Sequence, residues 1–209
     1  MTKRNDIQSE SLADIAIDPD VLAKELSEEF EVDPLEQIDN DSFSRGTQDK
    51  NLECDEALKL LKGNREQRIQ GLRIFCEYRD KRSFPLLLPL LEQPCPVERM
   101  SAVYALGRNP FPSAVKKLIS LLETDDNAYV RRATAWSLAN YDNQIVLKPL
   151  INSLKNDVAA VRLWSSSSLA EIGNISSSNA QLAAEQLLIS LKIDNEPVVR
   201  SNCIWSLCR

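Results

Sequence analysis

Large and small apolar residues recur along the chain at a fixed distance after an arginine. The five arginines are Arg68, Arg99, Arg131, Arg162 and Arg200, with spacings of 31, 32, 31 and 38 residues. Seven and eight residues after them stand the pairs Phe75-Cys76, Leu106-Gly107, Leu138-Ala139, Leu169-Ala170 and Leu207-Cys208. A large apolar residue followed by a smaller one, at a constant offset, predicts a helix that packs closely against a neighbouring helix.

A shorter apolar segment precedes each of these helices. The five segments are residues 57–61, 85–91, 115–122, 147–154 and 182–191. Two helices in about 30 residues, neither of which can bury its apolar face alone, are typical of stacked helical repeats. The pattern therefore predicts an all-α protein, a right-handed α-solenoid of about five helix pairs over residues 51–209.

Residues 1–50 have a different composition. They carry fourteen Asp and Glu against five Lys and Arg, whereas the rest of the chain carries seventeen against twenty. Such an acidic block predicts a largely disordered tail. Asp18-Pro19-Asp20 could begin a short helix near residues 19–30, because Asp caps helices and Pro suits their first turn. This segment either folds into a groove of the solenoid or of a partner, or stays solvated.

Composition excludes several kinds of enzyme. The chain contains no histidine, which removes the usual general base and the histidine-containing metal sites, and it has only five glycines and no phosphate-binding loop. The longest strongly apolar run, residues 84–91, is too short to span a membrane. No signal peptide is evident and the five cysteines are scattered, so we expect a cytoplasmic protein. The acidic balance of the chain argues against nucleic-acid binding.

The recurring arginines are interpreted as structural. Acidic or amide residues precede three of them, at Asp126, Asp157 and Asp194-Asn195. We expect these side chains to cap the second helix of a repeat and to lie within reach of the arginine of a neighbouring repeat. A binding site usually breaks a repeat pattern, whereas these arginines follow it.

The residues that differ between repeats gather on the side of the second helix away from the core. Tyr, Trp, Met and Arg there are the residue types enriched where proteins anchor one another. The predicted partner-binding residues are Arg73, Met100, Tyr104, Arg108, Arg132, Trp136, Trp164 and Trp205. The alternative is that the aromatic rings wedge between helices as the edge of the core.

The cysteines suggest packing more than chemistry. Cys76 and Cys208 occupy the small-residue position, and Cys203 also suits packing, whereas Cys95 lies in a turn between two prolines and is expected to be exposed and reactive. Cys95 or Cys203 could serve as a thiol ligand only with further ligands from a partner. Residues 175–179 are expected to form an inserted loop, and the last repeat stops at Arg209, which indicates either docking or a longer protein.

Four segments carry a resemblance to a known family. The chain resembles the phycobilisome-lyase type of HEAT-like repeat found in cyanobacteria over residues 55–209, notably in S-A-V-Y-A-L-G-R-N-P, Y-V-R-R-A-T-A-W-S-L-A-N, A-V-R-L-W-S-S-S-S-L-A and V-V-R-S-N-C-I-W-S-L-C-R. Through A-V-R-L-W and V-R-S-N-C the chain looks closest to the IscA-associated HEAT-repeat proteins, which bind A-type iron-sulfur carriers. This resemblance implies a non-catalytic scaffold for such a carrier or for an assembly factor.

A second branch of the same repeat family implies a different function. E/F-type phycobilin lyases pair as two solenoids that attach bilins to cysteines of phycobiliproteins, or remove them. The chain would then act with a phycobiliprotein and a second HEAT subunit. A general assembly chaperone of the photosynthetic apparatus is a third possibility. No intrinsic cofactor is expected, although an iron-sulfur cluster or a bilin could be shared with the partner.

Overall fold

The computed structural model describes residues 47–142 and 144–209. They belong to one compact unit, Arg45–Arg209. The predictions for the acidic segment 1–50, including the helix near 19–30, lie outside the described residues except at its end. There, the first described helix begins at Thr47, four residues before the predicted start of the solenoid.

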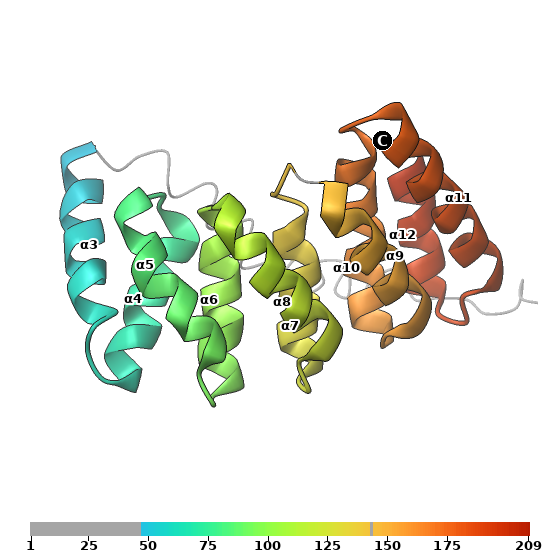
Figure 1. Cartoon of the computed structure of the whole chain (residues 1–209). Helices are drawn as coiled ribbons and strands as arrows, with labels where there is room; N and C mark the ends of the chain where they lie inside the picture. The colour runs from blue at the N-terminus through green and yellow to red at the C-terminus, as the bar shows by residue number, and fades with distance from the viewer. Residues whose placement is uncertain (1–46, 143) are drawn as a thin grey trace, which may run out of the picture. The chain divides into compact units, whose positions relative to one another are not determined.

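Helices follow one another in pairs along the described chain (Figure 1). The pairs are α3 (Thr47–Leu60) with α4 (Arg65–Glu77), α5 (Phe84–Leu87) with α6 (Pro96–Arg108), α7 (Val115–Thr124) with α8 (Ala128–Leu138), α9 (Leu147–Asn156) with α10 (Ala159–Gly173), and α11 (Ser177–Ile193) with α12 (Pro197–Leu207). Short 3-10 helices flank the first helices at Lys81–Ser83, Leu88–Glu92, Pro112–Ala114 and Gln144–Val146. The described residues contain no strand, so the predicted all-α solenoid of five helix pairs is confirmed.

The second helices form one continuous layer, because α4 packs against α6, α6 against α8, α8 against α10 and α10 against α12. The large apolar residue seven positions after the arginine is fully buried in the first four pairs, at Phe75, Leu106, Leu138 and Leu169. Each such side chain contributes about 1.5–3 kcal/mol when removed from water. The core therefore runs through the stack, with each helix pair completing the next.

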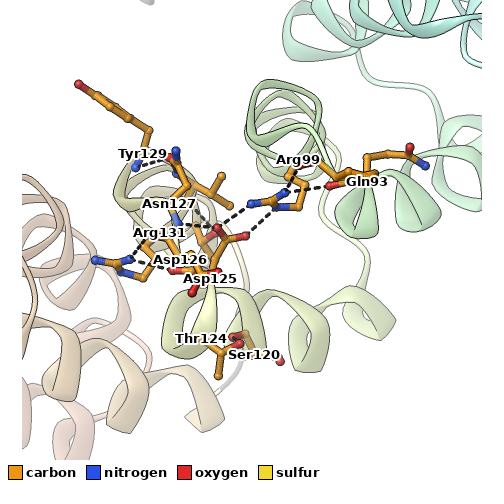
Figure 2. Close-up of polar contacts among 12 residues, drawn as sticks. Gln93, Arg99, Ser120, Thr124, Asp125, Asp126, Asn127, Tyr129 and Arg131 are labelled. Atoms are coloured by element: carbon orange, nitrogen blue, oxygen red, sulfur yellow. Dashed lines mark hydrogen bonds and ion pairs between the residues drawn. The ribbon is translucent and has the colours of Figure 1, made fainter.

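An arginine–carboxylate link joins each pair to its successor. Arg99 donates from Nε and Nη2 to Asp125 at 2.8 and 2.9 Å, and Arg68 donates from Nε to Glu98 at 2.7 Å. The same link joins Arg131 to Asp157 and Arg162 to Asp194 at 2.7 to 2.8 Å. The remaining nitrogen, Nη1, donates to a carbonyl oxygen in the turn before the arginine's own helix. Figure 2 shows Arg99 between the carbonyl of Gln93 and Asp125.

The links shift the ionisation of their carboxylates. Hydrogen bonds from Arg162 hold the pKa of Asp194 below its ordinary value, against the opposing effect of burial. Burial would raise the pKa of Asp125, but hydrogen bonds from Arg99 and from the Asn127 amide hold it below the ordinary value. The recurring arginines thus fix the register of the stack, as the sequence predicts.

The structure corrects the sequence-based assignment of one acidic residue. The carboxylate that pairs with Arg99 belongs to Asp125, whereas Asp126 is exposed. Asn127 caps α8 by accepting from the amides of Tyr129 and Val130. The turn between α7 and α8 thereby places Asp125, one residue earlier than expected, against the preceding repeat.

Two further expectations are wrong. The extra residues in the fourth interval do not form a loop over 175–179, because they lengthen the helices: α10 continues to Gly173, and Ser176 caps α11 by accepting from the Asn179 amide. Cys208 is exposed and not packed, because the described residues place no helix pair beyond α12.

Candidate partner-binding site

Five aromatic and arginine side chains meet on α6 and α8, and we call them the aromatic–arginine cluster: Tyr104, Arg108, Tyr129, Arg132 and Trp136. The rings of Tyr104 and Trp136 lie 5.3 Å apart at an angle of 55°. The guanidinium of Arg108 lies over the Trp136 ring at 5.7 Å. Arg132 donates from Nη2 to the Tyr104 hydroxyl at 3.4 Å and lies 5.5 Å from the Tyr129 ring. The structure thus brings together four of the predicted site residues.

A glycine makes room for the tryptophan of this cluster. A Cβ atom on Gly107 would lie 2.5 Å from Cζ3 of Trp136 and 3.2 Å from Cα of Ser137. Since carbon atoms do not approach so closely, only glycine lets α8 and the Trp136 ring lie this close to α6. Gly107 therefore sets the position of the ring that carries the cluster.

The cluster is partly buried and partly open to solvent. Tyr104, Arg108, Arg132 and Trp136 are half-buried, and Tyr129 is 65% exposed. The Nε of Arg132 is buried and has no hydrogen-bond partner among the described residues. Because this nitrogen is shielded from solvent, it marks a cost of packing Arg132 against the rings and not a point of contact for a partner.

The aromatic residues have features of both sequence-based interpretations, core packing and a partner-binding surface. Tyr104 wedges between α6 and α8 and packs against the core, as in the alternative interpretation. Its ring and that of Trp136 nevertheless stay partly accessible and are flanked by arginines. Whether a partner uses this surface remains a prediction.

The other predicted partner-binding residues lie outside the cluster. Met100 and Trp164 are half-buried and pack against the core, whereas Arg73 is exposed on α4. Trp205 is 49% exposed, and the guanidinium of Arg209 lies 4.7 Å from its ring. Trp205 and Arg209 thus form a second aromatic–arginine pair, on the last helix pair.

The thiols are placed differently from one another. Cys203 is fully buried, and burial raises its pKa to about 11, so this thiol has no access to a ligand at the surface. Cys95 is half-exposed at the start of α6, where amides of Glu98 and Val97 and the side chain of Arg65 lower its pKa. Arg65 donates to the Cys95 sulfur at 3.1 Å. No group of three or more potential metal-ligating His, Cys, Asp or Glu residues occurs within residues 47–142 and 144–209.

The hollows between helix pairs follow the arginine–carboxylate links. One of about 400 Å³ is lined by residues that include Arg131 and Asp157, and one of about 360 Å³ by residues that include Arg162 and Asp194. These charged groups are already paired with each other. We therefore interpret the hollows as gaps between stacked helix pairs and not as ligand-binding pockets.

Sequence reasoning missed some residues of the candidate site and of the fold around it. Tyr129 was not predicted as a site residue. It lies in the first turn of α8, and its ring contacts the guanidinium of Arg132. Glu98 was not predicted as a partner of Arg68, because it lies inside α6 and not in the preceding turn. Asn109 joins two pairs by donating to the carbonyls of Phe75 and Tyr78, and nothing in the sequence signalled it, because no asparagine stands at this position in the other repeats.

Comparisons with known proteins fit this architecture. The family model described as HEAT repeats matches residues 55–139 and 115–208. No curated protein sequence matches the chain. A chain in the structure of the complex of CpcE and CpcF of phycocyanin lyase from Nostoc sp. PCC7120 has a TM-score of 0.63 and 21% identity, with 73% of this chain and 98% of that chain covered. At this identity the likeness shows the fold. Within the described part of the chain, no helix could cross a membrane.

Proposed function

Because the chain belongs to the HEAT-repeat family, we propose that it is a protein-binding subunit of a phycobilin lyase of the E/F type. It would act beside a second HEAT-repeat chain on a phycobiliprotein. The similar solved structure supports this proposal, since it is a complex of two chains of a phycocyanin lyase and one of them is covered almost completely. The fold alone does not choose a function, so the proposal depends on the surface.

The observation that carries the proposal is the aromatic–arginine cluster. Half-buried aromatic rings beside guanidinium groups are typical of anchors at protein interfaces. The same chemistry suits a linear tetrapyrrole, which is flat, conjugated and bears carboxylates: rings such as Trp136 can stack on it and Arg108 or Arg132 can pair with its carboxylates.

The cluster is suited to binding and positioning. Its members are two tyrosines, two arginines and a tryptophan, so it contains no thiol or carboxylate that could form a covalent bond to a bilin or accept its proton at neutral pH. In our proposal the reacting thiol belongs to the phycobiliprotein, and this chain holds the bilin or the acceptor protein in place.

The iron-sulfur interpretation has no support beyond the sequence resemblance. It depended on A-V-R-L-W and V-R-S-N-C, and the structure gives several of those residues packing roles. Arg162 pairs with Asp194, Val161 and Cys203 are fully buried, and Asn202 donates to the Leu163 carbonyl at 3.0 Å. No comparison supports an iron-sulfur partner, so we do not propose one.

Co-expression tests the proposed function. The full chain would be produced with phycocyanin subunits, a bilin source and, in separate cultures, CpcE or CpcF of Nostoc sp. PCC7120 as the second HEAT subunit. We expect covalent bilin fluorescence on phycocyanin in denaturing gels only when both HEAT chains are present. Co-purification of an A-type carrier from native cells, with iron-sulfur absorbance and without phycobiliprotein, would contradict the proposal.

Variants of the cluster give a sharper test. Trp136→Ala and Tyr104→Ala should each raise the Kd for phycocyanin by about tenfold or more, because interface anchors cost at least 1–2 kcal/mol on truncation. Circular dichroism should show nearly unchanged helicity. Leu52→Ala, at an exposed apolar residue on α3, is the matched control and should not change binding. A loss of helicity equal to that of the core variant Leu138→Ala would mean that the rings serve packing alone.

A further inference from the structure

The members of the aromatic–arginine cluster follow a fixed order along α6 and α8. The two helices pack side by side and run in the same direction, because a carboxylate link joins the start of α6 to the turn before α8. Counted from the anchor arginine of each helix, the rings of Tyr104 and Trp136 stand at the fifth position. Arg132 stands at the first and Arg108 at the ninth. The rings thus lie between two guanidinium groups, with about 6 Å of helix rise on each side.

Contacts within the cluster hold both guanidinium groups. Arg108 lies over the Trp136 ring at 5.7 Å, and Arg132 lies 5.5 Å from the Tyr129 ring. A stacked guanidinium group can still bond a carboxylate in its own plane. A carboxylate would reach Arg132 at Nη1, because Nη2 donates to the Tyr104 hydroxyl and Nε is shielded from solvent. Side chains that are already ordered lose little entropy when a partner binds.

The open face of α6 and α8 is positive, although the whole chain has a net charge of -6. Glu98 is the only acidic residue of the two helices, and it is buried against Arg68. The anchor arginines are engaged in the carboxylate links, so Arg108 and Arg132 give this face its charge. The adjacent second helices carry exposed or half-buried acids, namely Glu66 and Glu77 on α4 and Glu171 on α10. Charge complementarity therefore favours an acid-bearing partner at α6 and α8.

The order arginine, ring, arginine matches one face of a helix. Residues i, i+4 and i+7 or i+8 of an α-helix share a face, and each turn adds about 5.4 Å. An acid, an apolar residue and a second acid at these positions would meet Arg132, the two rings and Arg108. A pigment is usually held in a concave pocket, whereas the hollows described above lie at the arginine–carboxylate links and not at the cluster.

We propose that the cluster binds one helix of the acceptor phycobiliprotein, which presents two carboxylates two turns apart and an apolar side chain between them. The inference rests on the proposed function and deepens it, because it assigns the cluster to the acceptor protein and not to the bilin. The apolar side chain would cover the partly open rings of Tyr104 and Trp136. Two separate charge pairs around an apolar anchor fix the orientation of the acceptor as well as its affinity.

A double-mutant cycle on the full chain tests for two separate carboxylates, with bilin-free phycocyanin subunits as the probe. Arg108→Gln and Arg132→Gln should each raise the Kd by about tenfold, and together by about 100-fold, since contacts this far apart act independently. If both arginines met one carboxylate, the double variant would bind no worse than the weaker single variant, which overturns the inference. Lys116→Gln, at an exposed residue of α7, is the matched control and should not change binding. Circular dichroism verifies that each variant is folded.

Photo-crosslinking identifies the bound element in a chain that keeps both arginines. Tyr129→benzoylphenylalanine places the crosslinker in the first turn of α8, at a side chain that is 65% exposed. We expect crosslinks to one phycocyanin helix with two acids seven or eight residues apart and an apolar residue between them. Replacing the acid nearest the crosslink by Lys should restore the binding that Arg132→Glu loses. Crosslinks to a segment without this pattern, or a lack of rescue, overturn the inference.

Free biliverdin, a linear tetrapyrrole, separates the inference from the proposed function. It should leave the Kd for phycocyanin within about twofold of its value without pigment, because the two would not share the cluster. Competition that Arg108→Gln and Arg132→Gln abolish would place the pigment at the cluster, which overturns the inference but not the proposed function. If phycocyanin does not bind at all and co-expression gives no bilin attachment, both are overturned.

Discussion

At the scale of single residues, one arginine in each of the first four repeats has two roles. Its Nη1 satisfies carbonyls of its own turn, and its remaining nitrogens reach the carboxylate of the next repeat. The pair Arg99–Asp125 is largely buried on both sides, at 15% and 3% side-chain exposure. Removing one partner of such a pair leaves the other charge without compensation in a poorly hydrated place. The links therefore matter for stability as much as for register.

Asp125→Ala should destabilise the fold by about 3 kcal/mol, because it leaves the guanidinium of Arg99 unpaired. Asp126→Ala is the matched control, since it removes the neighbouring carboxylate, which is exposed, and should cost less than about 0.5 kcal/mol. Urea unfolding followed by circular dichroism measures both. Equal effects of the two variants would show that the link contributes nothing to stability.

Acid should weaken the links in a definite direction. The pKa of Asp194 is lower in the folded chain than its ordinary value, so the folded chain binds fewer protons than the unfolded chain in this range. The stability it contributes is complete above about pH 5 and is lost as the pH falls through the ordinary pKa toward the lowered one. The gap in stability between wild type and Asp194→Asn should therefore narrow from pH 7 to pH 3.

The exposed carboxylate of Glu123 on α7 provides the control for this pH dependence. Glu123→Gln should track the wild type at both pH values, since Glu123 takes no part in the arginine–carboxylate links. If the gap for Asp194→Asn stays constant down to pH 3, the aspartate does not carry the acid sensitivity.

At the scale of helices, close approach depends on small residues at the contact. Gly107 lies under Trp136, and no described glycine has a positive φ, so this glycine is required by space and not by backbone conformation. Pro89 interrupts a predicted helix. The segment 85–91 is divided between α5 and a 3-10 helix, because proline lacks an amide donor.

Gly107→Ala should destabilise the chain by about 1–3 kcal/mol, because its methyl group collides with the Trp136 ring and the Ser137 backbone. The tryptophan fluorescence should shift as the ring is displaced. Gly173→Ala is the matched control: its new methyl group would meet atoms at 3.6 and 3.7 Å, an ordinary contact distance, so stability should be unchanged or slightly higher. If Gly173→Ala destabilised the chain more than Gly107→Ala, Trp136 would not pack against Gly107 as described.

The sequence predicted helices well and contacts between them less well. The five arginine-anchored helices and their shorter companions are all present, because a helical period is a local property. The contact of Tyr104 with Trp136, the seat on Gly107 and the role of Asp125 in place of Asp126 depend on how one pair meets the next. The extra residues in the fourth interval lengthened helices, since Ser and Asn at a helix start act as caps as readily as they form loops.

At the scale of the whole described stack, each pair makes its main contacts with its neighbours in sequence. Stability in such a stack is close to a sum of repeat and interface contributions. Repeats with neighbours on both sides, such as α7–α8, have two interfaces, whereas α11–α12 has one within the described residues. Seven of the twelve large apolar residues that are exposed in the described part of the chain lie on α11 and α12.

Hydrogen exchange should show this gradient. Amides in the last two turns of α12 should exchange about tenfold faster or more than those of α8, because the end pair can open without disturbing the rest. Mass spectrometry of peptides from the two helices measures both exchange rates, and equal rates for α8 and α12 would contradict this prediction.

The arginine–carboxylate links also bear on how such a chain can grow. Each internal repeat brings an acid for the repeat before it and an arginine for the repeat after it. A duplicated repeat therefore contains both the acid and the arginine that its neighbours need. The two new junctions can each form a link, and no buried charge is left unpaired. A cut within a turn, between Asp125 and Arg131 for example, separates the two halves. Gene duplication and protein engineering should both succeed more often when the boundary respects this unit.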